Sequence, residues 1–164
     1  MAIDSLHFRD ALARLGSAVN IVTTNGDAGL YGITMSAVSS VTDDPPTILA
    51  CINRDSAANE TVKLNQVFCV NMLAGRHQEI AGIFASKKIA VSKRFSTTGP
   101  WTALETGSPV LSDASVSLDC RVSNTIEVGS HTVFFGEVVA LALHDSRECL
   151  VYFDRGFNPL PLPA

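Results

Sequence analysis

Near residue 120, apolar and polar side chains alternate along the chain with a period of two. The apolar positions are Val116, Leu118, Cys120 and Val122, and the polar positions are Ser115, Ser117, Asp119 and Arg121. Successive side chains of a β-strand point to opposite faces of its sheet, so this pattern predicts a strand with one buried and one solvent-exposed face. Such strands are typical of antiparallel sheets. The stretch therefore indicates an antiparallel β-fold.

Six further strands are predicted from short runs rich in β-branched and apolar residues. They cover residues 18–24, 30–42, 47–53, 67–73, 131–144 and 149–153, and the first two form a hairpin across the turn at 25–29. Short helices are predicted at 5–15, 56–64 and 77–84, whereas 85–109 is expected to be irregular. Strands and helices do not alternate as they do in a doubly wound sheet. The sequence therefore favours a mainly β fold with peripheral helices, as a closed or split antiparallel barrel.

The first helix is predicted from an apolar stripe behind a capping residue. Asp4 or Ser5 can cap it, and Gly16 ends it. The stripe consists of Phe8, Ala11, Leu12 and Leu15. Because these residues share one helix face, the helix is expected to pack on another element.

Length and composition indicate one domain and a homo-oligomer. The 164 residues include 46% hydrophobic residues, so we expect a single domain over 1–164, with 158–164 as an extended C-terminal tail. Only 17% of the residues are charged, which leaves little polar material to cover a lone monomer. Twelve Lys and Arg against sixteen Asp and Glu give a net charge of -4, which disfavours nucleic-acid binding. No membrane span is expected, and the N-terminus has no signal-peptide pattern, which indicates a cytoplasmic chain.

The four cysteines, Cys51, Cys69, Cys120 and Cys149, do not follow a zinc-binding spacing. Each lies among apolar neighbours, so they are interpreted as buried free thiols. No metal site is predicted.

Common nucleotide-binding and hydrolase motifs are absent, but one segment is strongly basic. Between Ile80 and Leu104 there is no acidic residue, whereas Lys87, Lys88, Lys93 and Arg94 lie within eight positions. The segment is either a solvated surface loop or a cap over an anion.

A second candidate is the strand around residues 34–41, where small and hydroxylated side chains occupy nearly every other position. Such a strand allows a planar ligand to approach the backbone, while N–H, C=O and hydroxyl groups bind its polar edge. The same pattern also fits a strand packed under a loop.

Ordered blocks along most of the chain resemble the short-chain flavin reductase family. They are residues 8–11, 18–24, 32–42, 45–47, 51–53, 56 and 59, 70–73, 84–85, 94–95, 129 and 131, and 152–155. The similarity is strongest to reductase components of two-component flavin monooxygenases of the 4-hydroxyphenylacetate 3-monooxygenase type, and to the flavin reductase of pyrimidine breakdown. It implies a homodimeric split β-barrel that reduces FMN or FAD with NADH or NADPH and passes the reduced flavin to a monooxygenase.

The resemblance also implies which residues bind the flavin. Those on the strands are Thr34, Met35, Ser36, Ala37, Ser39, Ser40, Val41, Cys51, Ile52 and Asn53. Ser56 and Asn59 fall where a helix start meets the flavin phosphate, which free N–H groups and the helix dipole would stabilise. Phe84 and Lys87 fall on the segment that closes over the phosphate or ribityl end.

The implied nicotinamide-binding residues lie near the C-terminus. They are His131, Tyr152, Arg155 and Phe157. Many relatives have a histidine after the aromatic residue that corresponds to Phe157, whereas this chain has Asn158. Without the resemblance, the favoured interpretation of His131 is a histidine at the end of a strand that contacts only solvent; with it, contact with the nicotinamide is favoured.

No catalytic side chain is predicted, because hydride transfer between nicotinamide and flavin belongs to the two cofactors. Two alternatives remain at this level. One is a flavin-binding or carrier protein of the same fold without efficient NAD(P)H turnover. The other is an interaction scaffold, which would bind no flavin.

Overall fold

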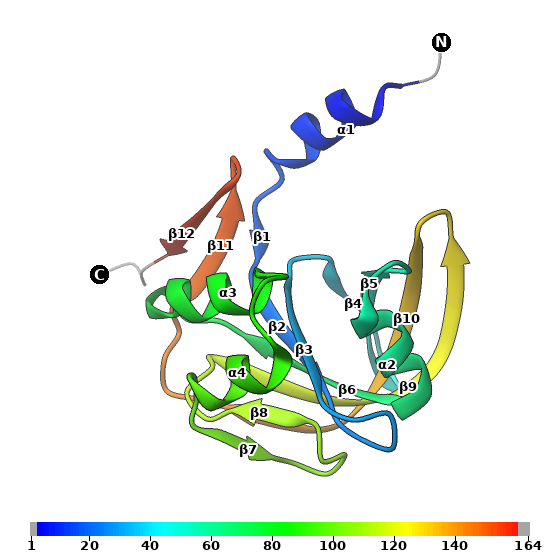
Figure 1. The fold of residues 1–164 in the computed structure, drawn as a ribbon, viewed down its shortest axis with the longest axis vertical. Coiled ribbons are helices and arrows are strands. Elements are labelled where there is room, and N and C mark those ends of the chain that lie inside the picture. Colours follow the sequence, from blue (N-terminus) through cyan, green and yellow to red (C-terminus); the bar gives the residue numbers. More distant parts are fainter. Residues whose placement is uncertain (1–2, 161–164) are drawn as a thin grey trace.

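The computed structural model describes residues 3–160 and contains one long antiparallel sheet (Figure 1). Its seven strands follow the order β3-β2-β6-β9-β10-β5-β4. The strands are β2 (Asn20–Thr24), β3 (Tyr31–Met35), β4 (Val38–Asp43), β5 (Pro46–Asn53), β6 (Val67–Met72), β9 (Val116–Val128) and β10 (His131–Leu143). Each neighbouring pair is antiparallel, as the alternating pattern predicted.

The two edge strands of this sheet, β3 and β4, are consecutive in the sequence. Only residues 36–37 separate them, and the N–H of Val38 donates to the carbonyl of Ser36 at 2.9 Å. The sheet therefore curves into a barrel that is split between β3 and β4, which confirms the expected fold class. The prediction of one continuous strand over 30–42 was wrong, because the chain leaves one edge of the sheet at this turn and joins the opposite edge.

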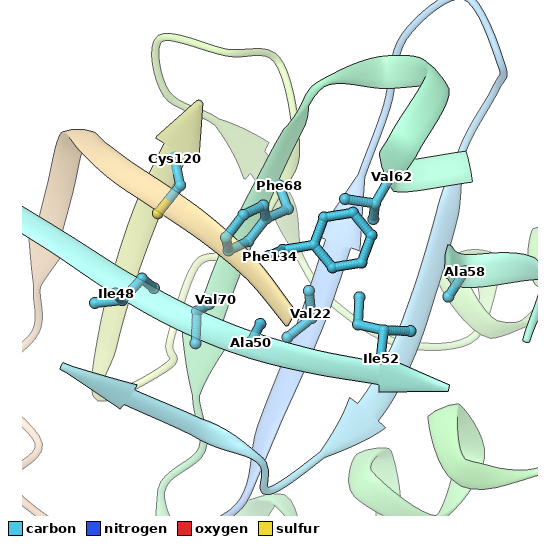
Figure 2. Packing of buried hydrophobic residues seen from close by; sticks show 10 residues of the cluster. All are labelled: Val22, Ile48, Ala50, Ile52, Ala58, Val62, Phe68, Val70, Cys120 and Phe134. Carbon is cyan, nitrogen blue, oxygen red and sulfur yellow. The ribbon is translucent and has the colours of Figure 1, made fainter. Parts of the chain in front are cut away.

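The interior of the barrel is filled by apolar side chains from opposite sides of the curved sheet (Figure 2). Phe68 on β6 and Phe134 on β10 lie at its centre, and Val62 packs on them from a helix. Gly136 makes room for Phe68, since a Cβ at this position would lie 2.4 Å from the ring. The close packing of these rings fixes the position of β10, which carries one wall of the barrel.

A second apolar cluster lies outside the barrel, against the face of β2 that points away from the barrel interior. It contains Val19, Ile21, Leu73, Ala81, Phe84, Leu111, Ala114 and Leu150. A three-stranded sheet covers part of it, with β11 (Cys149–Phe153) between β1 (Ser17–Ala18) and β12 (Gly156–Leu160).

The C-terminal segment is more regular than the sequence indicated. Residues 156–160 pair with β11 instead of forming an extended tail from 158, and the Asn158 side chain donates to the carbonyls of Phe153 and Gly156 at 3.2 and 3.1 Å. These bonds close the β11–β12 hairpin. The rest of the predicted tail and arm, residues 161–164, lies outside the described residues.

Within residues 3–160, four helices and one 3-10 turn surround the sheets. They are α1 (Ser5–Leu12), α2 (Ala57–Asn65), η1 (Gly75–His77), α3 (Gln78–Ala85) and α4 (Val91–Ser96). The expectation of an irregular segment at 85–109 was wrong, because it contains α4 and the short strands β7 (Trp101–Ala103) and β8 (Pro109–Leu111). No helix of the described part is long and apolar enough to cross a membrane.

The face of β9 that was expected to contact solvent is largely covered. Ser117 and Asp119 are both fully buried. Asp119 accepts hydrogen bonds from the N–H and hydroxyl of Thr106 at 2.7 and 2.5 Å, and Ser117 donates to Asn71 at 3.0 Å. The segment before β8 folds over this face and supplies the partners of Asp119, so the polar residues mark a buried hydrogen-bond network.

Helix α1 begins at the predicted cap, where Asp4 accepts from the N–H of Leu6, but it has no buried residue. The helix ends at Leu12, so the prediction that it continues to Gly16 was wrong and Leu15 lies beyond it. Phe8 and Leu12 of the apolar stripe are exposed, and the helix projects away from the body of the molecule (Figure 1). The expected packing partner is therefore not part of the described chain.

All four cysteines are free, as predicted, but only Cys69 and Cys120 are buried. Cys51 and Cys149 are partly exposed, because Cys51 lies near the end of β5 and Cys149 begins β11. Burial raises the pKa of the Cys120 thiol to about 12, with Asp119 adding to the effect.

Candidate functional site

A cavity of about 550 Å³ opens where the ends of β3 and β5 meet the start of α2 and the chain after α3. Eight of the predicted flavin residues line it: Thr34, Met35, Cys51, Ile52, Asn53, Ser56, Phe84 and Lys87. Its volume lies within the range of pockets that bind small molecules. β5 and α2 are consecutive, whereas β3 and the chain after α3 come from other parts of the sequence, so the barrel creates this cavity.

One wall of the cavity is the N-terminus of α2, where Ser56 and Ala57 line it. The hydroxyl of Ser56 caps the helix by accepting from the N–H of Ala58 at 3.3 Å, and Asn53 accepts from the N–H of Asp55 at 2.8 Å. The Asn59 amide donates to the carbonyl of Ile52 at 2.9 Å and ties α2 to β5. Asn59 is buried and does not line this cavity, whereas Ser56 does.

The opposite wall carries two basic side chains with different environments. Lys87 lines the cavity and is exposed. Arg94 also lines it but is buried, and its guanidinium donates to the carbonyls of Gly32, Ser86 and Ile89 at 2.9, 2.9 and 3.0 Å. Arg94 therefore holds the segment in place, and Lys87 remains available to an anion.

Three aromatic rings fix the segment that carries Lys87. Phe84 packs against Phe95 and Trp101 with ring centroids 5.0 and 5.5 Å apart, and Trp101 donates to the hydroxyl of Thr98 at 3.2 Å. Gly32 on β3 allows this approach, because a Cβ there would lie 2.6 Å from the Phe84 ring. Trp101 thus anchors the loop.

Two polar side chains on the strands of the cavity are Thr34, which is hydrogen-bonded, and Cys51, whose thiol is protonated. The hydroxyl of Thr34 donates to the carbonyl of Ala81 at 2.6 Å, which binds β3 to α3. The Cys51 thiol faces the cavity, and partial burial raises its pKa. The thiol is therefore mostly protonated at neutral pH.

A smaller hollow of about 170 Å³ adjoins the cavity along β3. Thr34 and Met35 line both, and the far side of the hollow is formed by Tyr152 and Phe157, whose rings lie 6.0 Å apart. Ser36 and Tyr152 connect this hollow to a third one, where Ala37 and Arg155 also lie. Of the four predicted nicotinamide residues, Tyr152 and Phe157 thus lie in the hollow beside the cavity, and Arg155 lies in the third hollow.

The remaining predicted residues lie outside these hollows. Ser39, Ser40 and Val41 are exposed on β4, at the edge of the split barrel. His131 on β10 is the cross-strand partner of Asn53 on β5, so it lies next to a cavity residue but does not line the cavity. The hydroxyl of Ser130 lies 2.9 Å from Nδ1 of His131. In the described chain these four side chains do not complete the site.

The structure adds cavity residues that the sequence reasoning did not single out. They are Tyr31, Ile33, Asp55, Ala57, Ala85 and Ser86. All except Tyr31, which lies three positions before Thr34, directly adjoin a predicted residue, and Asp55 directly precedes the capping Ser56. Extending the predicted motifs by one or two positions on either side would have found most of them.

Comparison with known proteins defines the class to which this fold and cavity belong. The model of the flavin reductase like domain matches residues 12–161, and the chain belongs to this family. The resemblance stated from the sequence is thereby confirmed.

Individual relatives are similar over nearly their whole length. An FMN reductase (NADH) RutF from Bradyrhizobium diazoefficiens is 49% identical over 151 residues, which cover 92% of this chain and 83% of the relative. The protein of the same name from Pantoea ananatis is 48% identical over 159 residues, covering 97% and 83%.

Solved structures of flavin reductases have the same fold. BorF, the flavin reductase component of a bacterial two-component tryptophan halogenase, is 28% identical with a TM-score of 0.91, covering 98% of this chain and 100% of BorF. The NADH:FAD oxidoreductase SgcE6 of Streptomyces globisporus, in complex with NAD and FAD fragments, is 26% identical with a TM-score of 0.87, covering 94% and 92%. These findings confirm the prediction of an oxidoreductase of the flavin reductase class.

Proposed function

We propose that the protein is an NADH-dependent flavin reductase that reduces FMN and supplies the reduced flavin to a partner monooxygenase. The observation that carries the proposal is the continuity of the two adjoining spaces. The 550 Å³ cavity, with Lys87 and the α2 N-terminus, shares Thr34 and Met35 with the aromatic hollow at Tyr152 and Phe157.

The residues of the cavity fit a flavin mononucleotide in size and in chemistry. The positive end of the α2 dipole, at Ser56 and Ala57, and the ammonium group of Lys87 suit a dianionic phosphate. Thr34, Met35, Cys51 and Ile52 provide a flat, mostly apolar wall suited to a ring system. No glycine-rich loop is needed, because the positive end of the helix dipole and Lys87 attract the phosphate.

The hollow beside β3 is the proposed place for the nicotinamide. Tyr152 and Phe157 would hold the ring against the flavin, and Arg155 lies in the connected hollow, where it also pairs with Asp10 of the N-terminal segment. The Asn158 side chain bonds within its own hairpin. It therefore keeps the Phe157 backbone in position, and we assign it no contact with the nucleotide.

When bound, the two cofactors supply the hydride donor and acceptor, so the chain needs no nucleophile or general acid. The protein's own residues hold the two rings at contact distance and exclude water. Holding the rings in one orientation lowers the entropic part of the activation barrier. Substitutions in the cavity should therefore raise KM or the flavin Kd more than they lower kcat.

The working form is proposed to be a cytoplasmic homodimer. The exposed stripe on α1 and exposed apolar residues at the tip of the β9–β10 hairpin, Ile126 and Val128, support a second copy. His131, Ser39, Ser40 and Val41 lie outside the hollows of the single chain and are expected to meet ligand only in the assembled dimer. The partner monooxygenase is inferred by analogy with two-component systems such as that of BorF.

The test is steady-state oxidation of NADH and NADPH by the purified protein with FMN, FAD or riboflavin, with cytochrome c as the final electron acceptor. Rapid oxidation that requires added flavin is the expected result. Flavin binding without oxidation of either nicotinamide would instead establish a carrier protein. Absence of flavin binding would leave only the scaffold interpretation.

A further inference from the structure

A second hollow of about 430 Å³ lies on the other side of the first turn of α2 from the flavin cavity. It is lined by Arg54, Asp55, Asn59, Glu60, Lys63, Gly129 and Ser130. Asp55 lines both spaces, so the second hollow begins where the proposed phosphate end of the flavin cavity stops.

The two cations of this hollow are held by a carboxylate on β9. Glu127 accepts from the Lys63 ammonium at 2.5 Å and lies 3.2 Å from Nε of Arg54. Thr132, its cross-strand neighbour on β10, donates to both carboxylate oxygens at 3.0 and 2.9 Å. Glu127 is thus fixed by three partners from three different parts of the chain.

Glu127 is ionised in neutral solution. The hydrogen bond from Lys63 lowers its pKa below the usual glutamate value; partial desolvation opposes this shift, and Thr132 and Arg54 add to it. Two carboxylates, Asp55 and Glu60, line the hollow together with Arg54 and Lys63, and Glu127 pairs with both cations from outside the lining, so three negative charges stand against two positive ones. The hollow carries excess negative charge although it contains two basic side chains.

FMN and FAD differ only beyond the phosphate that Lys87 and Ser56 are proposed to bind, where FAD carries a second phosphate and adenosine. The hollow next to Asp55 is large enough for part of this extension, so exclusion by size does not decide between the two flavins. The charge of the hollow decides between them instead. The second phosphate of FAD would enter a region of negative potential, because Arg54 and Lys63 are already paired with Glu127.

We propose that Glu127 determines flavin selectivity in favour of FMN by neutralising Arg54 and Lys63. The inference rests on the proposed function, since it assumes that the flavin phosphate lies at the α2 N-terminus. Glu127 acts through the two cations and touches no ligand, so it is a positioning residue.

The test compares the Kd values of FMN and FAD for the wild type and Glu127→Gln, measured separately by quenching of flavin fluorescence at low salt. Glutamine retains an acceptor for Thr132 but frees the two cations. The expected result is that FAD binds about three- to tenfold more tightly to the variant while the Kd of FMN changes less than about twofold. Adding Arg54→Gln to this variant should reverse the gain, and raised salt should diminish it.

The control is Glu105→Gln, which removes the same charge from an exposed pair with Arg121 outside the hollow. Equal effects of the two variants on FAD would overturn the proposal, as would a Glu127→Gln variant, folded by its melting temperature, with an unchanged FAD to FMN ratio. A wild type that binds FAD as tightly as FMN would overturn it too, and would leave the reductase function intact. A wild type that binds no flavin would instead refute the proposed function itself.

Discussion

Two basic residues seven positions apart, Lys87 and Arg94, show how burial divides one sequence feature into two roles. Arg94 is buried and directs its guanidinium to three backbone carbonyls, whereas Lys87 is exposed at the cavity. A buried guanidinium needs several acceptors to offset the loss of hydration. The charge run therefore contains both a structural cation and a candidate ligand for phosphate.

Replacing Lys87 with glutamine should weaken FMN binding by about tenfold, because a charge-assisted contact to the phosphate is lost. The Kd of riboflavin, which has no phosphate, should change little. Both constants are measurable by flavin fluorescence. Lys88→Gln is the matched control, since Lys88 is adjacent and exposed but does not line the cavity. An equal loss for riboflavin would contradict a phosphate contact at Lys87.

The thiol of Cys51 should report on occupation of the cavity. Because burial raises its pKa, the reactive thiolate is scarce at neutral pH, and alkylation by iodoacetamide should accelerate as the pH rises toward the thiol pKa. FMN should slow the alkylation of Cys51 but not that of Cys149, which also has a raised pKa and lies outside the cavity. Peptide mapping by mass spectrometry measures the alkylation rates of both thiols. If FMN slowed the alkylation of Cys51 and Cys149 equally, the flavin would bind outside the cavity.

At the scale of elements, the segment from Ser86 to Trp101 is held by side chains and not by its own regularity. Helix α4 has six residues and no side-chain cap, too little for independent stability. Arg94 and the three packed rings of Phe84, Phe95 and Trp101 supply the stability instead. Sequence periodicity could not reveal this, because Arg94 bonds to a strand residue 62 positions earlier.

Arg94→Gln should destabilise the protein by about 2 to 4 kcal/mol, since it leaves buried carbonyls without partners. Flavin affinity should fall as well, because the segment that carries Lys87 loses its attachment to β3. Chemical denaturation and flavin titration measure the two effects. Lys93→Gln, one position earlier and exposed, should change neither. A variant of Arg94 with wild-type stability would show that the ring cluster alone holds the segment.

At the scale of the molecule, two surfaces are uncovered. The polar strand β4 is exposed at the split of the barrel, and the apolar stripe of α1 is exposed on the projecting helix. A helix without any buried residue gains no stability from tertiary packing. Its apolar face is therefore the part of the surface that most needs a partner, in agreement with the low fraction of charged residues.

The wild type should sediment as a dimer in analytical ultracentrifugation, and Phe8→Glu combined with Leu12→Glu should shift it toward the monomer. Both residues are exposed on one face of α1, so the barrel itself should remain folded by circular dichroism. Leu64→Glu, which alters an exposed leucine at the end of α2, serves as control. A double variant that remains dimeric would exclude α1 from the interface.

Features that depend on neighbouring residues could be predicted from the amino-acid order alone. The alternation on β9, the cap of α2 at Ser56 and the stripe of α1 are local patterns, because strand and helix periods act over a few positions. The order of the motifs along the chain was also sufficient to identify the family.

Which residues share a site depended on contacts between distant segments. The split barrel brought the ends of β3 and β5 and the start of α2 together with Lys87, buried Arg94 and Asp119, and left Asn59 behind the cavity wall. It also bent the predicted strand at Ser36, and Asn158 became part of a hairpin. Burial and hydrogen-bond partners are set in these places by residues far away in the sequence, and no local pattern encodes them.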